Sequence, residues 1–494
     1  MSNPKDFKFS LKAMINKQKT KVLYVEADSD FADVLWSFLT LPLGTIVRVL
    51  NKHYGDEAPV VGSLTTLYNG LRNLDNGLFL SEDCKNLLLN PIRSSEVECR
   101  RLKINVDDTP PTRYFKCGDT NCQFSTLSMY FSGLKCSCQK PLDKKVYLRG
   151  LGDSGGGVFI ASKAPLIITD DLQILPSVTS TVVQILRNLG ITDTVGIVER
   201  SLTFGFNEIM DLLKGSLVSR APLTELIIDQ KPLNHVTMKI GVLPVDLIKP
   251  FSAKNVTLKA IVSANKLLFA EVDGDFVDFI FSLLALPLGG VEWLMGSDTC
   301  LTNIDNLYKS VSNMGINKYL KNIGKTEAQL LQPKLPLCYY SRTHFLSQNG
   351  IDFDPRYFFY NNDGECLPPL LPFSGGFRVS SYMFPEGQVT YYSGQWVPTT
   401  FAEGQEKYVK GLNMYMVTDD LTVTPLSSTS GFSVINSLKI PLSEVKELEL
   451  VVGLEEALSI LKASLTSSCA LTDGLITPFI RKQPKLFMTN SYFS

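Results

Sequence analysis

The sequence predicts an α+β protein built from two tandem homologous units. Each unit is expected to have an N-terminal β-hairpin, a pair of helices broken by a proline, and a mixed remainder of strands and helices. Three observations predict this fold: one long segment occurs twice, period-two alternation opens each unit, and apolar helical runs stop at a proline.

The duplication is clearest between KVLYVEADSDFADVLWSFLTLPLGTIVRVL (21–50) and KLLFAEVDGDFVDFIFSLLALPLGGVEWLM (266–295). Aligned without a gap, 13 of their 30 positions are identical, where chance would give about two. Shorter matches continue along the chain at offsets of 243–249 residues, among them two TDDL elements at 169–172 and 418–421. We therefore predict a first unit at 1–228, a proline-containing linker at 229–253 and a second unit at 254–494.

The first element of each unit is a β-hairpin. Apolar residues alternate with polar ones over 7–15, which is the pattern of a half-buried strand, and the polar run 16–20 is a turn before a return strand at 22–27. In the second unit this turn is two residues shorter, as a surface loop tolerates.

Two helices are expected next. Asp28 or Ser29 can cap a helix that runs to about Thr40, and Pro42 is placed to start a second helix through Leu50. Helical spacing returns near 62–75, 178–189 and 204–219, whereas the middle third of the unit has the composition of short strands and loops.

These repeated segments resemble a plant-expanded family catalogued as domain of unknown function 674. The resemblance rests on VLYVEADSDFADVLWSFLTLPLGTIVRVL, the two TDDL elements and the paired LLKxSLxS ends, and it covers almost the whole chain. It implies an uncharacterised tandem-repeat protein of plants, and it implies no particular activity or catalytic residue.

A group of four cysteines in the first unit predicts a metal site. Cys117 and Cys122 are followed by Cys136 and Cys138, and a β-hairpin can bring two such pairs together. Four thiolates suit a tetrahedral structural zinc ion, so we predict a zinc-ribbon-like insert near 114–148, with Cys99 as a substitute ligand. The second unit lacks this four-cysteine set, which favours a structural over a catalytic zinc.

A run of carboxylates at the strand-to-helix junction is the second candidate. Clustered carboxylates can bind Mg²⁺ or Ca²⁺, although acidic residues also stabilise a helix N-terminus without binding a metal. Helix capping is the interpretation that we favour. The run comprises Glu26, Asp28, Asp30 and Asp33 in the first unit and Glu271, Asp273, Asp275 and Asp278 in the second.

A third string, GDSGGG at 152–157, resembles the nucleophile segment of trypsin-like proteases. The chain has 3 histidines, helical segments that such a protease fold lacks, and no serine at the matching place in the second unit. We interpret the string as a glycine-rich loop and assign no catalytic role to Ser154.

The composition narrows the role of the chain. A net charge of −1 gives the chain no overall attraction to nucleic acid. The longest uncharged apolar stretches, 34–47 and 279–291, are too short to span a bilayer. Ten cysteines without a secretory signal predict a reducing compartment, cytoplasmic or nuclear.

The sequence favours a non-enzymatic binding or interaction protein with a structural zinc site, and a protein partner over a nucleic acid. The first alternative is a metal-dependent hydrolase or transferase that uses the acidic run. The second alternative is a nucleic-acid-binding module, because basic residues lie on the first hairpin and before the cysteines.

Overall fold

The computed structural model describes residues 6–228 and 255–482. Short gaps within these ranges are at 94, 120–121, 123–126, 133, 137, 149–156, 162–164 and 412, and within 337–406 only 339, 346 and the four strands given below are described. The predicted linker and Ser154 therefore lie outside the described residues.

The described residues form three sheets, and the first of them contains the N-terminal hairpin. Side chains of β1 alternate between buried and solvent-facing positions, as the sequence pattern predicts, and β1 pairs with β2 and β8 while β6 extends the sheet beyond β2. The strand order is β7-β6-β2-β1-β8, all antiparallel, with β1 (Phe9–Ile15), β2 (Val22–Ala27), β6 (Leu166–Thr169), β7 (Ile174–Pro176) and β8 (Val198–Phe204).

The second sheet repeats this arrangement. Its hairpin closes through Ala264 and Asn265, both with positive φ, as a two-residue turn between antiparallel strands requires. Replacing each strand of the first sheet by the strand at the matching place in the second half gives this order. That order is β16-β15-β10-β9-β17, with β9 (Val256–Ser263), β10 (Lys266–Val272), β15 (Tyr415–Thr418), β16 (Val423–Pro425) and β17 (Lys446–Val452).

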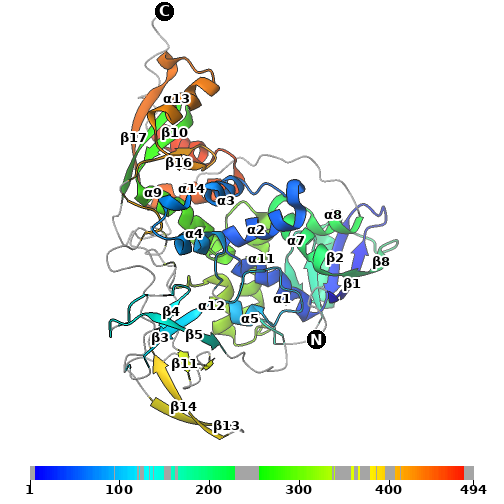
Figure 1. The fold of residues 1–494 in the computed structure, drawn as a ribbon. Helices are drawn as coiled ribbons and strands as arrows, with labels where there is room; N and C mark the ends of the chain where they lie inside the picture. Colours follow the sequence, from blue (N-terminus) through cyan, green and yellow to red (C-terminus); the bar gives the residue numbers. More distant parts are fainter. Residues whose placement is uncertain are drawn as a thin grey trace, which may run out of the picture.

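The third sheet joins strands from both halves of the chain. The middle third indeed forms short strands, and β5 pairs in parallel with β12. Figure 1 places this sheet at the end of the molecule opposite to β17 and α13. Its order is β13-β14-β11-β12-β5-β3-β4, with β3 (Tyr114–Cys117), β4 (Leu127–Met129), β5 (Leu142–Leu148), β11 (Phe358–Tyr360), β12 (Glu365–Leu367), β13 (Val379–Phe384) and β14 (Gly387–Gly394).

The helices predicted for the first half start within two residues of the expected positions, whereas three further helices, α4, α5 and α8, were not predicted. Asp28 caps α1 by accepting the N–H of Phe31, and a 3₁₀ turn continues α1 to Thr40. Pro42 precedes the first residue of α2, which runs four residues further than expected, to Tyr54. The helices are α1 (Ser29–Ser37), α2 (Leu43–Tyr54), α3 (Leu64–Asn73), α4 (Glu82–Leu89), α5 (Glu96–Cys99), α6 (Thr179–Asn188), α7 (Phe206–Val218) and α8 (Pro222–Ile228).

The second half has matching helices. Asp273 caps α9 as Asp28 caps α1, and Pro287 precedes α10 as Pro42 precedes α2. The helices are α9 (Gly274–Ser282), α10 (Leu288–Leu294), α11 (Thr302–Ile316), α12 (Ile323–Leu331), α13 (Ser428–Ser437), α14 (Leu454–Thr466) and α15 (Thr477–Lys482).

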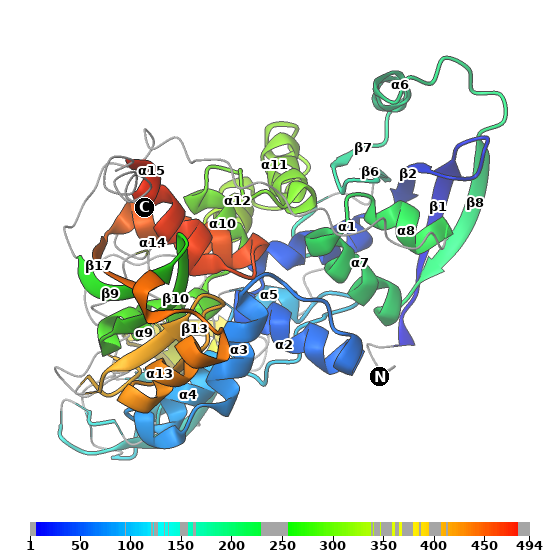
Figure 2. The ribbon, with the colours of Figure 1, turned by 90° about the horizontal axis from the view of Figure 1, so that it is seen from above.

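One apolar core runs through both halves. The largest group of contacting buried side chains contains the inner faces of β1 and β9 together with α1, α2, α9 and α10 (Figure 2). These helices and sheets confirm the predicted α+β class. Within the described part of the chain, every helix is too short or too polar to cross a membrane.

Candidate metal centre

The four predicted cysteines lie at one end of the small sheet β4-β3-β5. Cys117 is the last residue of β3, whose pairing with β5 places it opposite Leu142. The turn that contains Cys136 and Cys138 leads directly into β5, so strand pairing carries it to the end of β3. Cys122 follows β3 by a few residues and completes the group.

The spacing of the four sulfurs suits a metal ion. The Sγ atom of Cys138 lies 3.5 Å from that of Cys117 and 3.6 Å from that of Cys122, which is 3.6 Å from the Sγ of Cys136. All four atoms lie within 4.8 Å of one another, and none of the four cysteines forms a disulfide bond. Sulfurs about 2.3 Å from a tetrahedral zinc are about 3.8 Å apart, whereas a disulfide bond brings them to about 2.05 Å.

Backbone N–H groups are directed at the sulfurs. The N–H of Asp119 donates to Cys117, and the N–H of Lys140 donates to Cys138, each two residues after the cysteine. The Lys140 N–H, helped by the neighbouring thiols, lowers the pKa of Cys138 to about 7, whereas burial raises the pKa of Cys117. Hydrogen bonds to a sulfur favour the thiolate, which is the form that binds metal.

The apolar core of this part of the chain is small among the described residues. Its buried core consists of Phe115, Cys117, Cys136 and Leu142, so half of the core is thiol. The ammonium of Lys140 joins the two cysteine turns by an ion pair of 2.7 Å with Asp119. A metal ion bound by all four sulfurs would therefore cross-link a subdomain with a very small apolar core.

Cys99, the predicted substitute ligand, is not part of this group. It is fully buried in the main core, 3.7 Å from the hydroxyl of Thr40, and burial raises its pKa to about 11. In the second half, Cys366 lies on β12, and its side chain is outside the described residues.

The acidic run of the first half is divided among structural tasks. Asp28 caps α1, and Glu26 accepts a hydrogen bond of 3.0 Å from the Ser177 hydroxyl. Asp30 lies in the first turn of α1, where a carboxylate stabilises the helix dipole. Capping was the interpretation favoured for this run, and for Asp28 it is confirmed.

Asp33 has a different task, which the sequence did not reveal. Its side chain is buried and accepts the backbone N–H groups of residues 158, 159 and 160 at 2.5–3.0 Å. Burial raises the pKa of Asp33 to about 7 although these three donors favour its ionised form. Gly157 allows this approach, since a Cβ there would lie 2.8 Å from the carboxylate. The last glycine of GDSGGG thus serves packing.

The second half repeats this division. Asp273 caps α9, Asp275 forms an ion pair with Lys407, and Glu271 lies half-buried on β10. Asp278 accepts the N–H groups of Tyr408 and Val409 at 3.1 and 3.0 Å, and burial raises its pKa to about 8. A buried aspartate in the apolar stretch of a helix, present in both halves, was the available signal for this docking role.

Only the cysteines, among the described residues, bring three or more metal-ligating side chains together. The acidic run does not come together as a group of three or more ligands there. The first aspartate of each TDDL element links the five-stranded sheet of its half to a helical segment near the end of that half. Asp170 accepts the N–H and the hydroxyl of Thr224, and Asp419 accepts those of Thr472.

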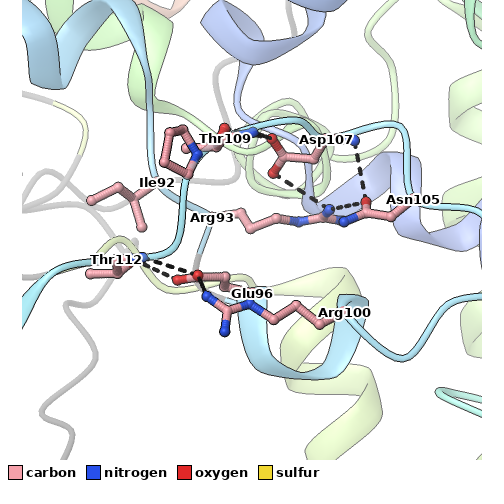
Figure 3. A pocket seen from close by; sticks show the side chains of 9 residues that line it. Ile92, Arg93, Glu96, Arg100, Asn105, Asp107, Thr109 and Thr112 are labelled. Carbon is pink, nitrogen blue, oxygen red and sulfur yellow. Dashed lines mark hydrogen bonds and ion pairs between the residues drawn. The ribbon is translucent and has the colours of Figure 1, made fainter. Parts of the chain in front are cut away.

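A small pocket lies beside α5 (Figure 3). On one side of the pocket, the guanidinium of Arg93 donates to the side-chain oxygen of Asn105 and forms an ion pair with Asp107. On the other side, the carboxylate of Glu96 forms an ion pair with Arg100 and accepts the backbone N–H of Thr112. Its volume of about 30 Å³ holds one or two water molecules and is far below the 300 Å³ or more of typical ligand sites.

A comparison with family models matches residues 5–454 to the family described as "Protein of unknown function (DUF674)". No curated protein and no solved structure matches the chain.

Proposed function

Because the chain belongs to the DUF674 family, which is defined without an activity, we propose its role from its own residues: it is a non-enzymatic interaction protein with a structural zinc site. Zinc is held by Cys117, Cys122, Cys136 and Cys138, and it stabilises the strands around it as a binding surface for another protein.

The single observation that carries this proposal is the group of four cysteines without disulfide bonds, with 3.5–3.6 Å between neighbouring sulfurs. Four sulfur ligands complete a tetrahedral site and leave no open position for substrate or water, which is typical of structural zinc. When bound, the ion supplies cross-links and no Lewis-acid chemistry. The two N–H···S bonds favour the thiolate form of Cys117 and Cys138, which is the form that binds metal.

Two further observations support an interaction role. The carboxylates that a metal-dependent hydrolase would use cap helices or receive backbone N–H groups in both halves. The cysteine group also lies in the sheet at one end of the molecule, in Figure 1, away from the two five-stranded sheets. A partner can reach this sheet without disturbing the core.

Metal analysis of the purified chain tests the zinc. We expect about one zinc per chain, which Cys136→Ser combined with Cys138→Ser removes. Cys300→Ser is the matched control, because Cys300 is a free, half-buried thiol outside the group. Less than about half an equivalent in the wild type, or equal zinc in the double variant, would reject the site.

Affinity capture with the same three proteins tests the role. We expect partner proteins that bind the wild type and Cys300→Ser but not the double variant. An identical set of partners for all three would reject the small sheet as the binding surface. Lys144 and Lys145 are exposed on β5. Salt-sensitive binding of a mixed-sequence oligonucleotide, abolished by Lys144→Glu with Lys145→Glu, would replace the proposal with nucleic-acid binding.

A further inference from the structure

The two halves touch through equivalent residues at the centre of the molecule. Leu43 donates its N–H to the carbonyl of Leu286 at 2.9 Å, and Leu288 donates its N–H to the carbonyl of Leu41, also at 2.9 Å. Pro42 lies opposite Pro287 in an antiparallel bridge. Each residue is 245 positions from its counterpart. A contact in which equivalent residues exchange the same bonds is what a twofold axis generates.

Two glycines at equivalent positions make matching close contacts with the opposite half. A Cβ added to Gly44 would lie 3.1 Å from the carbonyl oxygen of Leu284, and a Cβ added to Gly289 would lie 3.1 Å from that of Leu39. Leu39 and Leu284 are themselves counterparts. Small residues therefore let α2 and α10 approach the opposite half closely at symmetry-related points.

Each half also places one helix on the other half's sheet. Helix α3 packs against β16 (Figure 1), and its counterpart α11 packs against β7 (Figure 2). The hydroxyl of Thr66 on α3 donates to the carbonyl of Asp420, and the side-chain amide of Asn306 on α11 donates to the carbonyl of Asp171 at 2.9 Å. The helices are thus exchanged between the halves.

The segments that follow these helices are exchanged as well. After α3, the backbone N–H of Leu80 donates to the carbonyl of Tyr408 at 3.0 Å. The neighbouring Phe79 pairs with Val409 in an isolated antiparallel β-bridge. In the second half, Lys321 donates to the carbonyl of Phe159 at 2.7 Å. The receiving segments are those that Asp33 and Asp278 hold, so each buried carboxylate positions the docking edge for the opposite half.

We propose that the contact between the halves is a complete dimer interface with exchanged helices, and that its occupant is a half-chain of this same protein, whether or not the two halves are covalently joined. Most of its polar contacts are made to backbone carbonyls, which any copy of the unit supplies. Halves of two chains can therefore pair through it, and the segment 229–253 serves only to keep the two halves of one chain close together.

Cleavage of the folded chain tests this. A site for a specific protease is placed within 229–253, and the purified full-length protein is cut after folding. We expect both pieces to elute together near the 54.8 kDa of the intact chain, with a melting temperature that now rises with protein concentration. Separate elution of the pieces, or precipitation of one of them, would overturn the proposal.

Exchange provides the second readout. Cut protein with an affinity tag on its first half is mixed with untagged cut protein, partly denatured and refolded. We expect tagged first halves to retain untagged second halves. If refolding restores the complex but hybrids never form, the halves do not pair in trans and the proposal fails.

A matched pair of variants identifies the interface. Gly44→Val should weaken the association of the cut halves about tenfold or more, because its side chain meets Leu284 of the opposite half as well as Pro91 of its own half. Gly324→Val is the control, since a Cβ there meets no atom within 4 Å. If Gly44→Val does not fold, Thr66→Val serves as the test variant instead. It removes the hydrogen bond from the Thr66 hydroxyl to the carbonyl of Asp420, which should weaken the association of the cut halves about fivefold. Unchanged association in the folded variants would contradict the interface.

Discussion

Replacing the buried carboxyl of Asp33 by an amide should change how the stability of the protein depends on pH. Burial raises the pKa of Asp33 from an ordinary 3.8 to about 7. In the unfolded chain the same carboxyl ionises near its ordinary value. Asp33→Asn removes this difference and keeps an oxygen that can accept the N–H groups of Phe159 and Ile160.

The sign of the effect follows from proton binding. Below about pH 4 the carboxyl is protonated in both states, and its contribution to stability is fully present. As the pH rises toward 7 the unfolded chain releases the proton while the native protein retains it, so this contribution is lost. A pKa difference of about 3 corresponds to about 4 kcal/mol between pH 4 and 8.

Urea denaturation of the wild type and Asp33→Asn at several pH values measures the difference. At pH 5 the variant should be the less stable protein, because its amide N–H₂ faces the N–H of Val158 and that hydrogen bond is lost. Its deficit should shrink by about 3 kcal/mol on going to pH 8. Ser37→Ala, on the same helix, changes no ionisable group and should keep a constant deficit.

Parallel pH curves for the wild type and Asp33→Asn would refute this reasoning. They would mean that the native carboxyl is ionised throughout, and that its three N–H donors outweigh the cost of burial. Asp278→Asn should behave in the same way, with the loss extending to about pH 8.

Two further changes test the packing of each half. Gly157→Ala should destabilise the protein by about 1–3 kcal/mol, because its methyl would lie 2.5 Å from the carbonyl oxygen of Ile160. Gly324→Ala is the control and should be neutral or stabilising. Equal urea midpoints for the two variants would contradict this. Thr224→Val should cost about 2–4 kcal/mol, because the hydroxyl both donates to Asp170 and accepts the N–H of Val22. Thr472→Val, at the same place in the second half, should cost as much, and a small effect of either in thermal unfolding would show that the network is dispensable.

Local features of this fold were predictable because their causes are local. Alternation of buried side chains defined β1, a carboxylate after a strand marked the start of α1, and Pro42 marked the break before α2. The four cysteines were predicted as one group because two close pairs on a hairpin have few other arrangements.

Relationships between distant parts were not predictable in this way. The apolar stripe of α3 shows that one face is buried, but it has no information on which half of the chain covers it. The same holds for Gly44, whose need for close approach arises only from the position of Leu284. Asp33 lies in an apolar helical stretch, which indicates that it faces inward, but this pattern does not show which distant backbone segment its carboxylate binds.

The proposed site, in which four thiolates hold a structural zinc, is tested most directly by X-ray absorption at the zinc edge of the purified protein. We expect a single shell of four sulfurs at about 2.3 Å from the metal. A shell with nitrogen or oxygen neighbours at about 2.0–2.1 Å would contradict it, because an open or mixed site would then replace the closed site of Cys117, Cys122, Cys136 and Cys138.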